Sequence, residues 1–311
     1  MPKIFITGSI AFDYLLSYDG SFTESIKTDA LKDLSLAFVT PHMEKQFGGT
    51  GANIAWNLKL LGGDPFLASS VGEDGKSYIE RLSEFDIDTR AIEIVDNAIT
   101  ATAILATDTN EQHIIFFHPG ADALGSWTNV NEYKDLASYA IVSPRDIPAM
   151  QKAFEWCLSS SIPVLFDPGQ QISSFADDEL NRMIEKSNSV IANSYEWKLI
   201  SEKINSSPEE ISKKIDFAIV TQGEDGADVY VKGDKTHVSA CKPKKVINPT
   251  GAGDAFRAGL LYGLGNKLNL NESVKLGAAM GSFVVEITGT QLENFDRKML
   301  EKRIEKTYGI N

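Results

Sequence analysis

A run of small residues that ends in a carboxylate, residues 250–254 (Thr-Gly-Ala-Gly-Asp), limits the possible folds of this chain more than any other stretch. Residues 255–264 follow it with apolar and small side chains at helical spacing, so they predict a helix that begins directly after the glycines. Glycines let the backbone approach a ligand closely, and the free N–H groups at a helix start favour anions, phosphate above all.

Asp254 does not fit a pure anion site, because its carboxylate would repel a phosphate group. The conflict disappears if Asp254 takes a proton from a hydroxyl group that then attacks the phosphate. This is the general-base role in phosphoryl transfer to an alcohol. The alternative is structural: residues 251–254 form a tight turn in which Asp254 caps the helix. This stretch alone leaves both interpretations open.

The composition indicates a globular protein and excludes several classes of partner. The chain has 311 residues, 42% hydrophobic and 23% charged, enough for one large α/β domain or two smaller ones. Its net charge of −13 argues against nucleic-acid binding, and no uncharged apolar run reaches the length of a membrane span. Cys157 and Cys241 have no metal or redox spacing, which predicts a reducing, cytoplasmic location.

Strands and helices alternate along most of the chain, a rhythm that indicates a doubly wound, mostly parallel sheet. Two runs within residues 98–118 break it, because they flank the turn residues 108–111 and predict an antiparallel hairpin. With strands expected near residues 12–18 and 37–46, this hairpin is predicted to form a small β-sheet lid that excludes water from a substrate. The other expected strands are 3–7, 66–71, 91–95, 140–143, 163–166, 189–192, 217–221 and 229–231, and the main expected helices are 54–61, 77–85, 148–159, 177–186, 255–264, 274–287 and 296–308.

Two N-terminal segments carry polar residues where open α/β sheets bind ligands. Asp13 follows the first strand after a short loop, and the carboxyl end of a parallel strand faces the ligand crevice. In residues 48–53, the paired Gly48 and Gly49 leave the backbone unobstructed, and Asn53 offers both a donor and an acceptor to hydroxyl groups. A loop aspartate and a glycine-rich turn are the structural alternatives.

Two further segments follow strands in the second half of the chain. Asn193 and Glu196 face the same way on the first turn of a helix. Magnesium bound with ATP keeps most of its waters, and carboxylates often bind those waters, so the pair suits water-mediated magnesium placement. A helix capping box fits the same spacing equally well. Residues 221–226 (Thr-Gln-Gly-Glu-Asp-Gly) form a turn with two glycines, a weak pattern by itself.

Taken in order, these motifs resemble the signatures of the PfkB (ribokinase-like) carbohydrate kinases. The resemblance rests on the spacing from Gly8 to Asp13, on residues 48–55, on Asn193-x-x-Glu196, on residues 221–226 and on residues 248–259. It covers essentially the whole chain and implies one kinase domain over residues 1–311, a three-layer α/β/α sandwich with a mostly parallel central sheet and a small β lid. The implied reaction is ATP- and Mg²⁺-dependent phosphorylation of a primary hydroxyl group.

The resemblance also implies roles for particular residues. Asp254 would be the general base, and the N–H groups of Gly251, Ala252 and Gly253 would form an anion hole for the transferring phosphoryl group. The residues expected to contact substrate hydroxyl groups are Asp13, Gly48, Gly49 and Asn53. Glu196 would hold Mg²⁺ through water, and the residues expected to contact ATP are Asn193, Thr221, Gly223, Gly226, Gly251 and Gly253.

Several acceptors are compatible with this reaction. Residues 117–121 and 166–170 look most like those of prokaryotic adenosine- or nucleoside-kinase-like members, so a nucleoside 5′-kinase is the first hypothesis. A sugar kinase of the ribokinase or fructokinase type is the second. From another class, the chain could be a non-catalytic nucleotide- or sugar-binding protein, although a pure binder has no need for a base at Asp254.

One departure from the family pattern concerns cations. Many members have Asp-Thr where this chain has Asn248-Pro249. In ribokinases that region helps to form a monovalent-cation site, so the resemblance leaves K⁺ activation open. It also leaves open whether the protein is a monomer or a homodimer.

Overall fold

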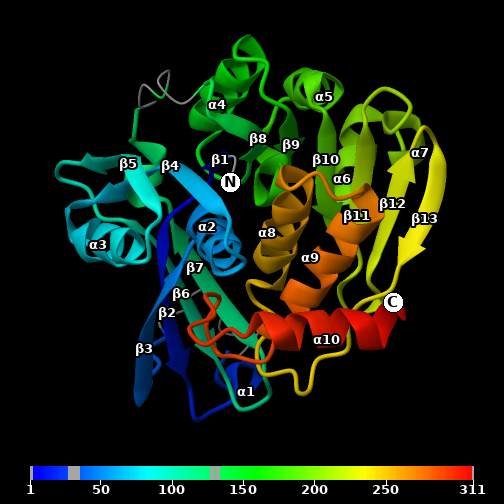
Figure 1. The fold of residues 1–311 in the computed structure, drawn as a ribbon. Coiled ribbons are helices and arrows are strands. Elements are labelled where there is room, and N and C mark those ends of the chain that lie inside the picture. Colours follow the sequence, from blue (N-terminus) through cyan, green and yellow to red (C-terminus); the bar gives the residue numbers. More distant parts are fainter. Residues whose placement is uncertain (1–2, 27–35, 127–129, 131–133, 310–311) are drawn as a thin grey trace.

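The computed structural model describes residues 3–26, 36–126, 130 and 134–309. Two sheets organise these residues, a large sheet of nine strands and a small sheet of four strands that lies to one side of it (Figure 1). In spatial order, the large sheet contains β13 (Asp234–Val238), β12 (Ala227–Val231), β11 (Phe217–Thr221), β10 (Ser189–Asn193), β9 (Val164–Phe166), β8 (Ala137–Val142), β1 (Lys3–Thr7), β4 (Asp64–Gly72) and β5 (Asp88–Val95).

The large sheet is parallel from β5 to β11, and β12 and β13 add an antiparallel edge. The expectation of a mostly parallel sheet is therefore confirmed. β1 lies between β4 and β8, so the order of the strands reverses beside β1. Open α/β sheets bind ligands at the carboxyl ends of the strands next to such a reversal.

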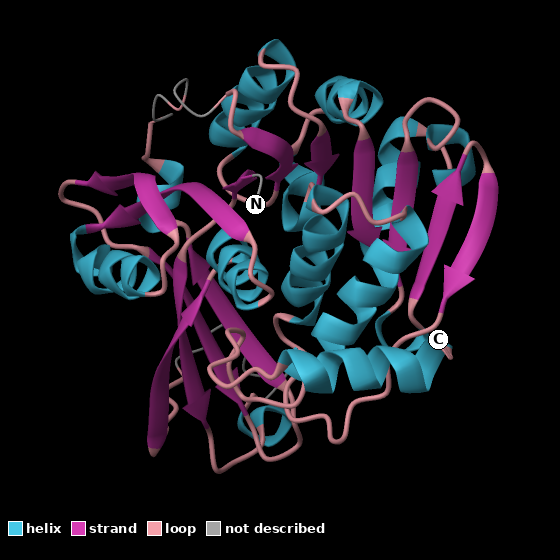
Figure 2. Ribbon diagram, in the orientation of Figure 1, coloured by secondary structure: helices cyan, strands magenta, loops and turns pink. Residues whose placement is uncertain are grey.

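Side chains alternate between the two faces of the large sheet and separate two apolar cores. Ile4 and Ile6 of β1 belong to one core, and Phe5 between them belongs to the other. Helices cover both faces, as Figure 2 shows, so the three-layer architecture is also confirmed. The first core is covered by α2 (Thr50–Leu60), α3 (Lys76–Glu84), α8 (Ala252–Gly265), α9 (Leu270–Val284) and α10 (Arg297–Tyr308), and the second by α4 (Ile147–Ser159), α5 (Asp177–Lys186), α6 (Ser194–Ile204) and α7 (Pro208–Ile211).

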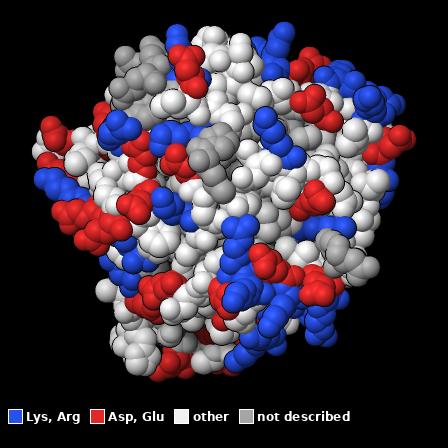
Figure 3. Space-filling view, in the orientation of Figure 1, with Lys and Arg blue, Asp and Glu red and all other residues white. Residues whose placement is uncertain are grey.

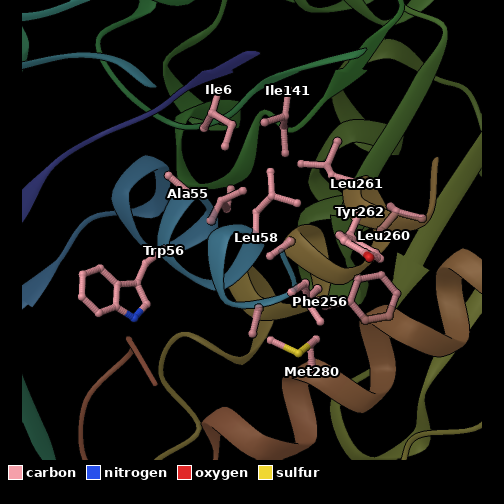
Figure 4. Close-up of a cluster of buried hydrophobic side chains, with 14 of the residues drawn as sticks. Ile6, Ala55, Trp56, Leu58, Ile141, Phe256, Leu260, Leu261, Tyr262 and Met280 are labelled. Atoms are coloured by element: carbon pink, nitrogen blue, oxygen red, sulfur yellow. The ribbon is translucent and has the colours of Figure 1, made fainter. Parts of the chain in front are cut away.

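The first core fixes the position of α8, which carries the Gly-Ala-Gly-Asp run at its start. Leu58 of α2 and Leu260 of α8 lie together in this core (Figure 4). On its other side α8 contacts α9 through backbone, because a Cβ added to Gly259 would lie 2.7 Å from the Cα of Gly277. The small residues of α9 therefore allow two helices to approach each other closely.

The small sheet has the strand order β3 (His42–Gly48), β2 (Ala11–Ser17), β6 (Ala101–Thr107) and β7 (His113–His118). β6 and β7 form the expected antiparallel hairpin, and the carboxylate of Asp108 in its turn accepts N–H groups from Asn110, Gln112 and the first residue of α1 (Phe22–Ser25). The strand predicted at residues 37–46 is shifted to His42–Gly48. It begins after Pro41, which has no N–H group to give to a neighbouring strand.

The helix α9 and the strand β13 also differ from the sequence-based expectation. The helix predicted at residues 274–287 is α9, which begins at Leu270 because Asn269 and Glu272 form a capping box there. β13 is not predicted at all, because four of its five residues are exposed and its sequence, Asp-Lys-Thr-His-Val, is polar. Such a composition is typical of an edge strand.

The surface is polar, with acidic and basic side chains interspersed on the face shown in Figure 3. On that face Lys and Arg gather over α10. None of the helices within the described ranges has the length and apolar character needed to cross a bilayer.

We predict that Gly259→Ala destabilises the protein, although alanine is normally the better helix former by about 1 kcal/mol. The added Cβ would meet backbone atoms of α9, so we expect a loss of about 1–3 kcal/mol in the free energy of unfolding, measured with urea. Gly265→Ala in the same helix is the control, because its Cβ would meet only the flexible Cδ1 of Ile4. A Gly259→Ala protein at least as stable as Gly265→Ala would contradict this account of the packing.

Candidate active site

A cavity of about 650 Å³ opens at the carboxyl ends of β9, β10 and β11. Its walls come from the segments that follow these strands, from residues 240–249 and from α9, and the start of α8 lies against it. It brings together residues that lie far apart in the sequence, from Thr50 to Val285. The residues expected to contact ATP, magnesium or the transferring phosphoryl group all line it: Asn193, Glu196, Thr221, Gly223, Gly226, Gly251, Ala252, Gly253 and Asp254.

The start of α8 has the geometry that anion binding requires. Gly251 is its N-cap residue and has a φ of 81°, in the left-handed region that favours glycine. A Cβ there would also lie 2.7 Å from the Cβ of Thr290. The N–H of Ala252 donates to Pro249 O at 3.3 Å, a long bond for which a phosphate oxygen can compete. Asp254 is the third residue of the helix, so the alternative of a capping aspartate is wrong.

The carboxylate of Asp254 is poised for proton transfer. Its Oδ2 accepts a hydrogen bond from Asn53 Nδ2 at 2.9 Å. Burial raises the pKa of Asp254 to about 6; the Asn53 hydrogen bond and the Arg257 charge lower it, whereas the charges of Asp167 and Asp13 raise it. A carboxyl group with this pKa is largely ionised at neutral pH and still accepts a proton readily, which suits a general base.

Arg257, which sequence reasoning misses, ties the first turn of α8 to the segment after β9. Its guanidinium donates to both carboxylate oxygens of Asp167, at 2.5 and 2.7 Å, and to the carbonyl oxygen of Gly253 at 3.0 Å. Both charged groups are buried, and a buried ion pair is tolerated only when it is this well bonded. The sequence did contain a signal for this ion pair, because Arg257 is the one charged residue in the otherwise apolar helical run 255–264.

Three of the four residues expected to bind the substrate lie together where the small sheet joins α2. Asp13 on β2 lies beside Gly48 at the end of β3, and a Cβ on Gly48 would overlap the Asp13 carboxylate. Gly49 has a φ of 91°, and a Cβ there would lie 2.5 Å from the backbone nitrogen of Ala11. Burial raises the pKa of Asp13 to about 6.

Asn53, the fourth of these residues, is already bonded within the protein. It is 3% exposed, and its Oδ1 accepts hydrogen bonds from Thr290 Oγ1 at 2.8 Å and from Gln291 Nε2 at 3.3 Å. One amide hydrogen goes to Asp254. The expectation that Asn53 offers a free acceptor to a hydroxyl group is therefore wrong, and only its second amide hydrogen remains for a substrate.

The structure confirms the capping box of Asn193 and Glu196, and their role toward magnesium stays a prediction. They form a capping box, in which Asn193 Oδ1 accepts from Glu196 N at 2.9 Å and Glu196 Oε2 accepts from Asn193 N at 2.8 Å. Glu196 also faces the cavity, and burial followed by the charge of Asp167 raises its pKa. Its Oε1 accepts no hydrogen bond from the described residues, so it fits a role toward the waters of a magnesium ion bound with ATP.

The segment 221–226 forms a tight turn at the cavity wall. The N–H of Gln222 donates to Gly226 O at 2.8 Å, and Gly223 and Gly226 have φ values of 60° and 106° that glycine tolerates. The Gln222 side chain donates to Asp228 Oδ2 at 2.9 Å, which ties the turn to β12. The backbone between β11 and β12 can therefore approach a nucleotide without steric obstruction.

Asn248 occupies the region where the resemblance places a monovalent cation. Its Oδ1 accepts from Thr250 N at 2.9 Å, and its Nδ2 donates to Thr288 O at 2.8 Å. Its own N–H donates to Val285 O at 3.3 Å. The amide thus joins the loop before α8 to the loop after α9. An N–H donor therefore already occupies one of the two lone pairs of the Thr288 carbonyl oxygen, which leaves one lone pair for a cation there.

Comparison with known proteins identifies relatives along the whole chain. The profile of the "pfkB family carbohydrate kinase" family matches residues 16–296. A nucleoside kinase of Methanocaldococcus jannaschii is 31% identical over 312 residues, which cover 98% of both chains. The structure of the Burkholderia thailandensis nucleoside kinase in complex with inosine is 32% identical, with a TM-score of 0.89 and coverage of 99% of both chains. The ribokinase of Thermotoga maritima, at 21% identity and a TM-score of 0.82 over 98% of this chain and 100% of that chain, shares the fold.

The raised pKa of Asp254 predicts that this residue makes the protein less stable as pH rises. The folded state binds more protons than the unfolded state between pH 3.8 and about 6, so the free energy of unfolding falls through this range. We expect Asp254→Asn, which cannot ionise, to be more stable than the wild type by about 3 kcal/mol at pH 8, with a gain of less than about 1 kcal/mol near pH 4. Urea unfolding at both pH values measures this, with the exposed Asp234→Asn as control. Equal stability of Asp254→Asn and wild type at pH 8 would refute it.

Proposed function

Since the chain belongs to the pfkB family of carbohydrate kinases, phosphotransferases with an alcohol group as acceptor, we propose that it phosphorylates nucleosides. The phosphoryl group would come from ATP and go to the 5′-hydroxyl group. Family membership sets aside the alternative of a non-catalytic binding protein. One arrangement supports the proposal. Asp254, the buried carboxylate that we propose as the base, lies at the start of α8, where N–H groups can bind an anion. Asp13, the carboxylate that we propose to bind substrate hydroxyl groups, lies near it.

In the proposed reaction Asp254 removes the proton of the 5′-hydroxyl group as its oxygen attacks the γ-phosphorus. The bond between that phosphorus and the bridging oxygen breaks, and ADP leaves. The N–H groups at Gly251, Ala252 and Gly253 stabilise the charge on the transferring phosphoryl oxygens. Glu196 would hold magnesium bound with ATP through the waters of the ion, and the ion would neutralise charge on the phosphates.

On the acceptor side, Asp13 accepts hydrogen bonds from a pair of neighbouring ribose hydroxyl groups. The register of the small sheet supports a base-binding surface on the same face. Asp13 pairs with Ala103, and Ala103 pairs with Phe117, so all three side chains lie on one face of the sheet. Phe117 is 54% exposed and lies two strands from Asp13, about 10 Å away. An exposed aromatic ring at this place suits stacking with a nucleobase, and a free sugar has no group to use it.

We predict that the purified protein releases ADP from MgATP with nucleosides such as inosine, adenosine, guanosine or cytidine. We expect kcat/KM for the best nucleoside to exceed that for ribose or fructose at least tenfold, because one stacked base contributes about 1–3 kcal/mol. Asp254→Asn should lower kcat by about 10²–10⁴ and leave the KM values nearly unchanged. A preference for a free sugar would overturn the choice of acceptor, and near-normal turnover of Asp254→Asn would overturn the assignment of the base.

We further predict that turnover does not require K⁺, because the Asn248 amide already joins the loops on either side of the anion hole. The rate of ADP release in a buffer with K⁺ should agree within about twofold with the rate in a buffer with a bulky organic cation. A twofold ratio of rates corresponds to a difference well below 1 kcal/mol in activation free energy. Asn248→Asp places a carboxylate oxygen opposite the Thr288 carbonyl, so this variant should lose activity and regain part of it with K⁺. Strong K⁺ activation of the wild type would contradict the proposal.

A further inference from the structure

Three buried side chains form a hydrogen-bonded path from the small sheet to Asp254, and the proposed function does not account for it. The path begins at the carbonyl group of Gly48, the last residue of β3. It continues through Tyr78 of α3, Gln291 in the segment between α9 and α10, and Asn53 of α2. Tyr78, Gln291 and Asn53 are 0%, 6% and 3% exposed.

Four hydrogen bonds connect these groups. Tyr78 OH donates to Gly48 O at 2.8 Å, and Gln291 Nε2 donates to Tyr78 OH at 2.6 Å. Gln291 Nε2 also donates to Asn53 Oδ1 at 3.3 Å, and Asn53 Nδ2 donates to Asp254 Oδ2 at 2.9 Å. The path therefore ends on the proposed base.

The chemistry of its first group fixes the direction of the whole path. A carbonyl oxygen only accepts, so the single proton of Tyr78 OH is used on Gly48, and burial raises the pKa of Tyr78 and keeps that proton in place. The phenol oxygen must then accept, so Gln291 presents its NH₂ group to it. The same NH₂ group faces Asn53, so Asn53 turns its oxygen to Gln291 and its own NH₂ group to Asp254.

This orientation matters because an amide side chain can bind in two ways. If Asn53 were rotated by half a turn, its Oδ1 would face the Asp254 carboxylate and repel it. Thr290 Oγ1 also lies 2.8 Å from Asn53 Oδ1, but it lies 3.2 Å from Phe47 O as well, and its one proton serves only one of them. The NH₂ group of Gln291 is a donor in either case.

A second observation indicates that Gln291 is not there for stability alone. Its Oε1 is buried and accepts no hydrogen bond from the described residues. An unsatisfied buried acceptor destabilises a fold. Rotating the Gln291 amide would not help, because Oε1 would then face the oxygens of Tyr78 and Asn53. Gln291 therefore leaves its Oε1 without a hydrogen bond while its NH₂ group donates to both Tyr78 and Asn53.

We propose that Gln291 is a positioning residue of the phosphoryl-transfer reaction, which sets the orientation of the Asn53 amide and through it the position and ionisation of Asp254. This inference rests on the proposed function, because it assigns Asp254 as the base. Asn53 acts on Asp254 as the orienting aspartate acts on the histidine of a catalytic triad.

The first test is the pH dependence of kcat/KM in Gln291→Met, which removes both donors and keeps most of the volume. Without the Asn53 hydrogen bond the ionised form of Asp254 is less favoured, so the acidic limb of the profile should move to higher pH. The other charged groups that face Asp254, namely Asp13 of β2, Asp167 after β9 and Arg257 of α8, are unchanged. We expect kcat at neutral pH to fall about 10- to 100-fold, with KM for ATP within about twofold of the wild type.

Trp56→Phe is the matched structural control. Trp56 Nε1 donates to Leu292 O at 2.8 Å and anchors the same segment, one residue beyond Gln291, and among the described residues its side chain makes no hydrogen bond with that of Asn53. We expect this variant to lose stability but to keep the acidic limb of the wild type. Gln291→Glu is the second variant, because its ionised carboxylate cannot donate to Asn53, and it should shift the limb in the same direction.

A measurement without substrate separates this inference from the proposed function. The pH dependence of the stability difference between Asp254 and Asp254→Asn reports the Asp254 pKa even if no acceptor is turned over. We expect that pKa to be higher in the Gln291→Met background than in the wild type. An unchanged acidic limb and an unchanged Asp254 pKa in Gln291→Met would overturn the proposal. Equal shifts in Trp56→Phe would overturn it as well.

Discussion

The hydrogen bond from Asn53 to Asp254 stabilises the ionised form of a buried carboxylate at the start of α8. Burial favours the protonated form of Asp254, and the hydrogen bond from Asn53 and the charge of Arg257 oppose this effect. Arg257 is in turn paired with Asp167 through two hydrogen bonds.

The fold supplies the elements that meet at this carboxylate. Asn53 comes from the helix that follows the small sheet, and Asp254 from a helix whose N-cap Gly251 has a positive φ. The two helices share one apolar core, and α9 supports α8 from the other side through glycine contacts. A displacement of either helix would change the distance between Asn53 and Asp254. The close packing of the apolar core therefore fixes the geometry of the hydrogen bond between Asn53 and Asp254.

The small sheet contributes groups that lie near the same carboxylate. Its strand β2 carries Asp13, and its strand β3 ends at Gly48, whose carbonyl group receives the Tyr78 hydroxyl group. Two carboxylates, Asp13 and Asp254, with raised pKa values thus lie near each other, an arrangement that is unfavourable for folding and useful for chemistry. Exposed apolar side chains on β7, among them Phe117, are compatible with a surface that a ligand covers.

Local residues alone determined most of the strands and helices along the chain, the expectation of a mostly parallel sheet, the β6–β7 hairpin and the glycine-rich segments of the cavity. These features depend on neighbours in sequence: alternation of apolar residues, positive φ at Gly251, and turn residues between strands. Tertiary structure decided the pairing of Arg257 with Asp167, 90 residues away, and of Gln291 with Asn53, 238 residues away. It also decided that Asn53 uses its acceptor inside the protein. No local pattern specifies such contacts, because they arise only when separate helices pack on one sheet and bring their polar side chains within hydrogen-bonding distance.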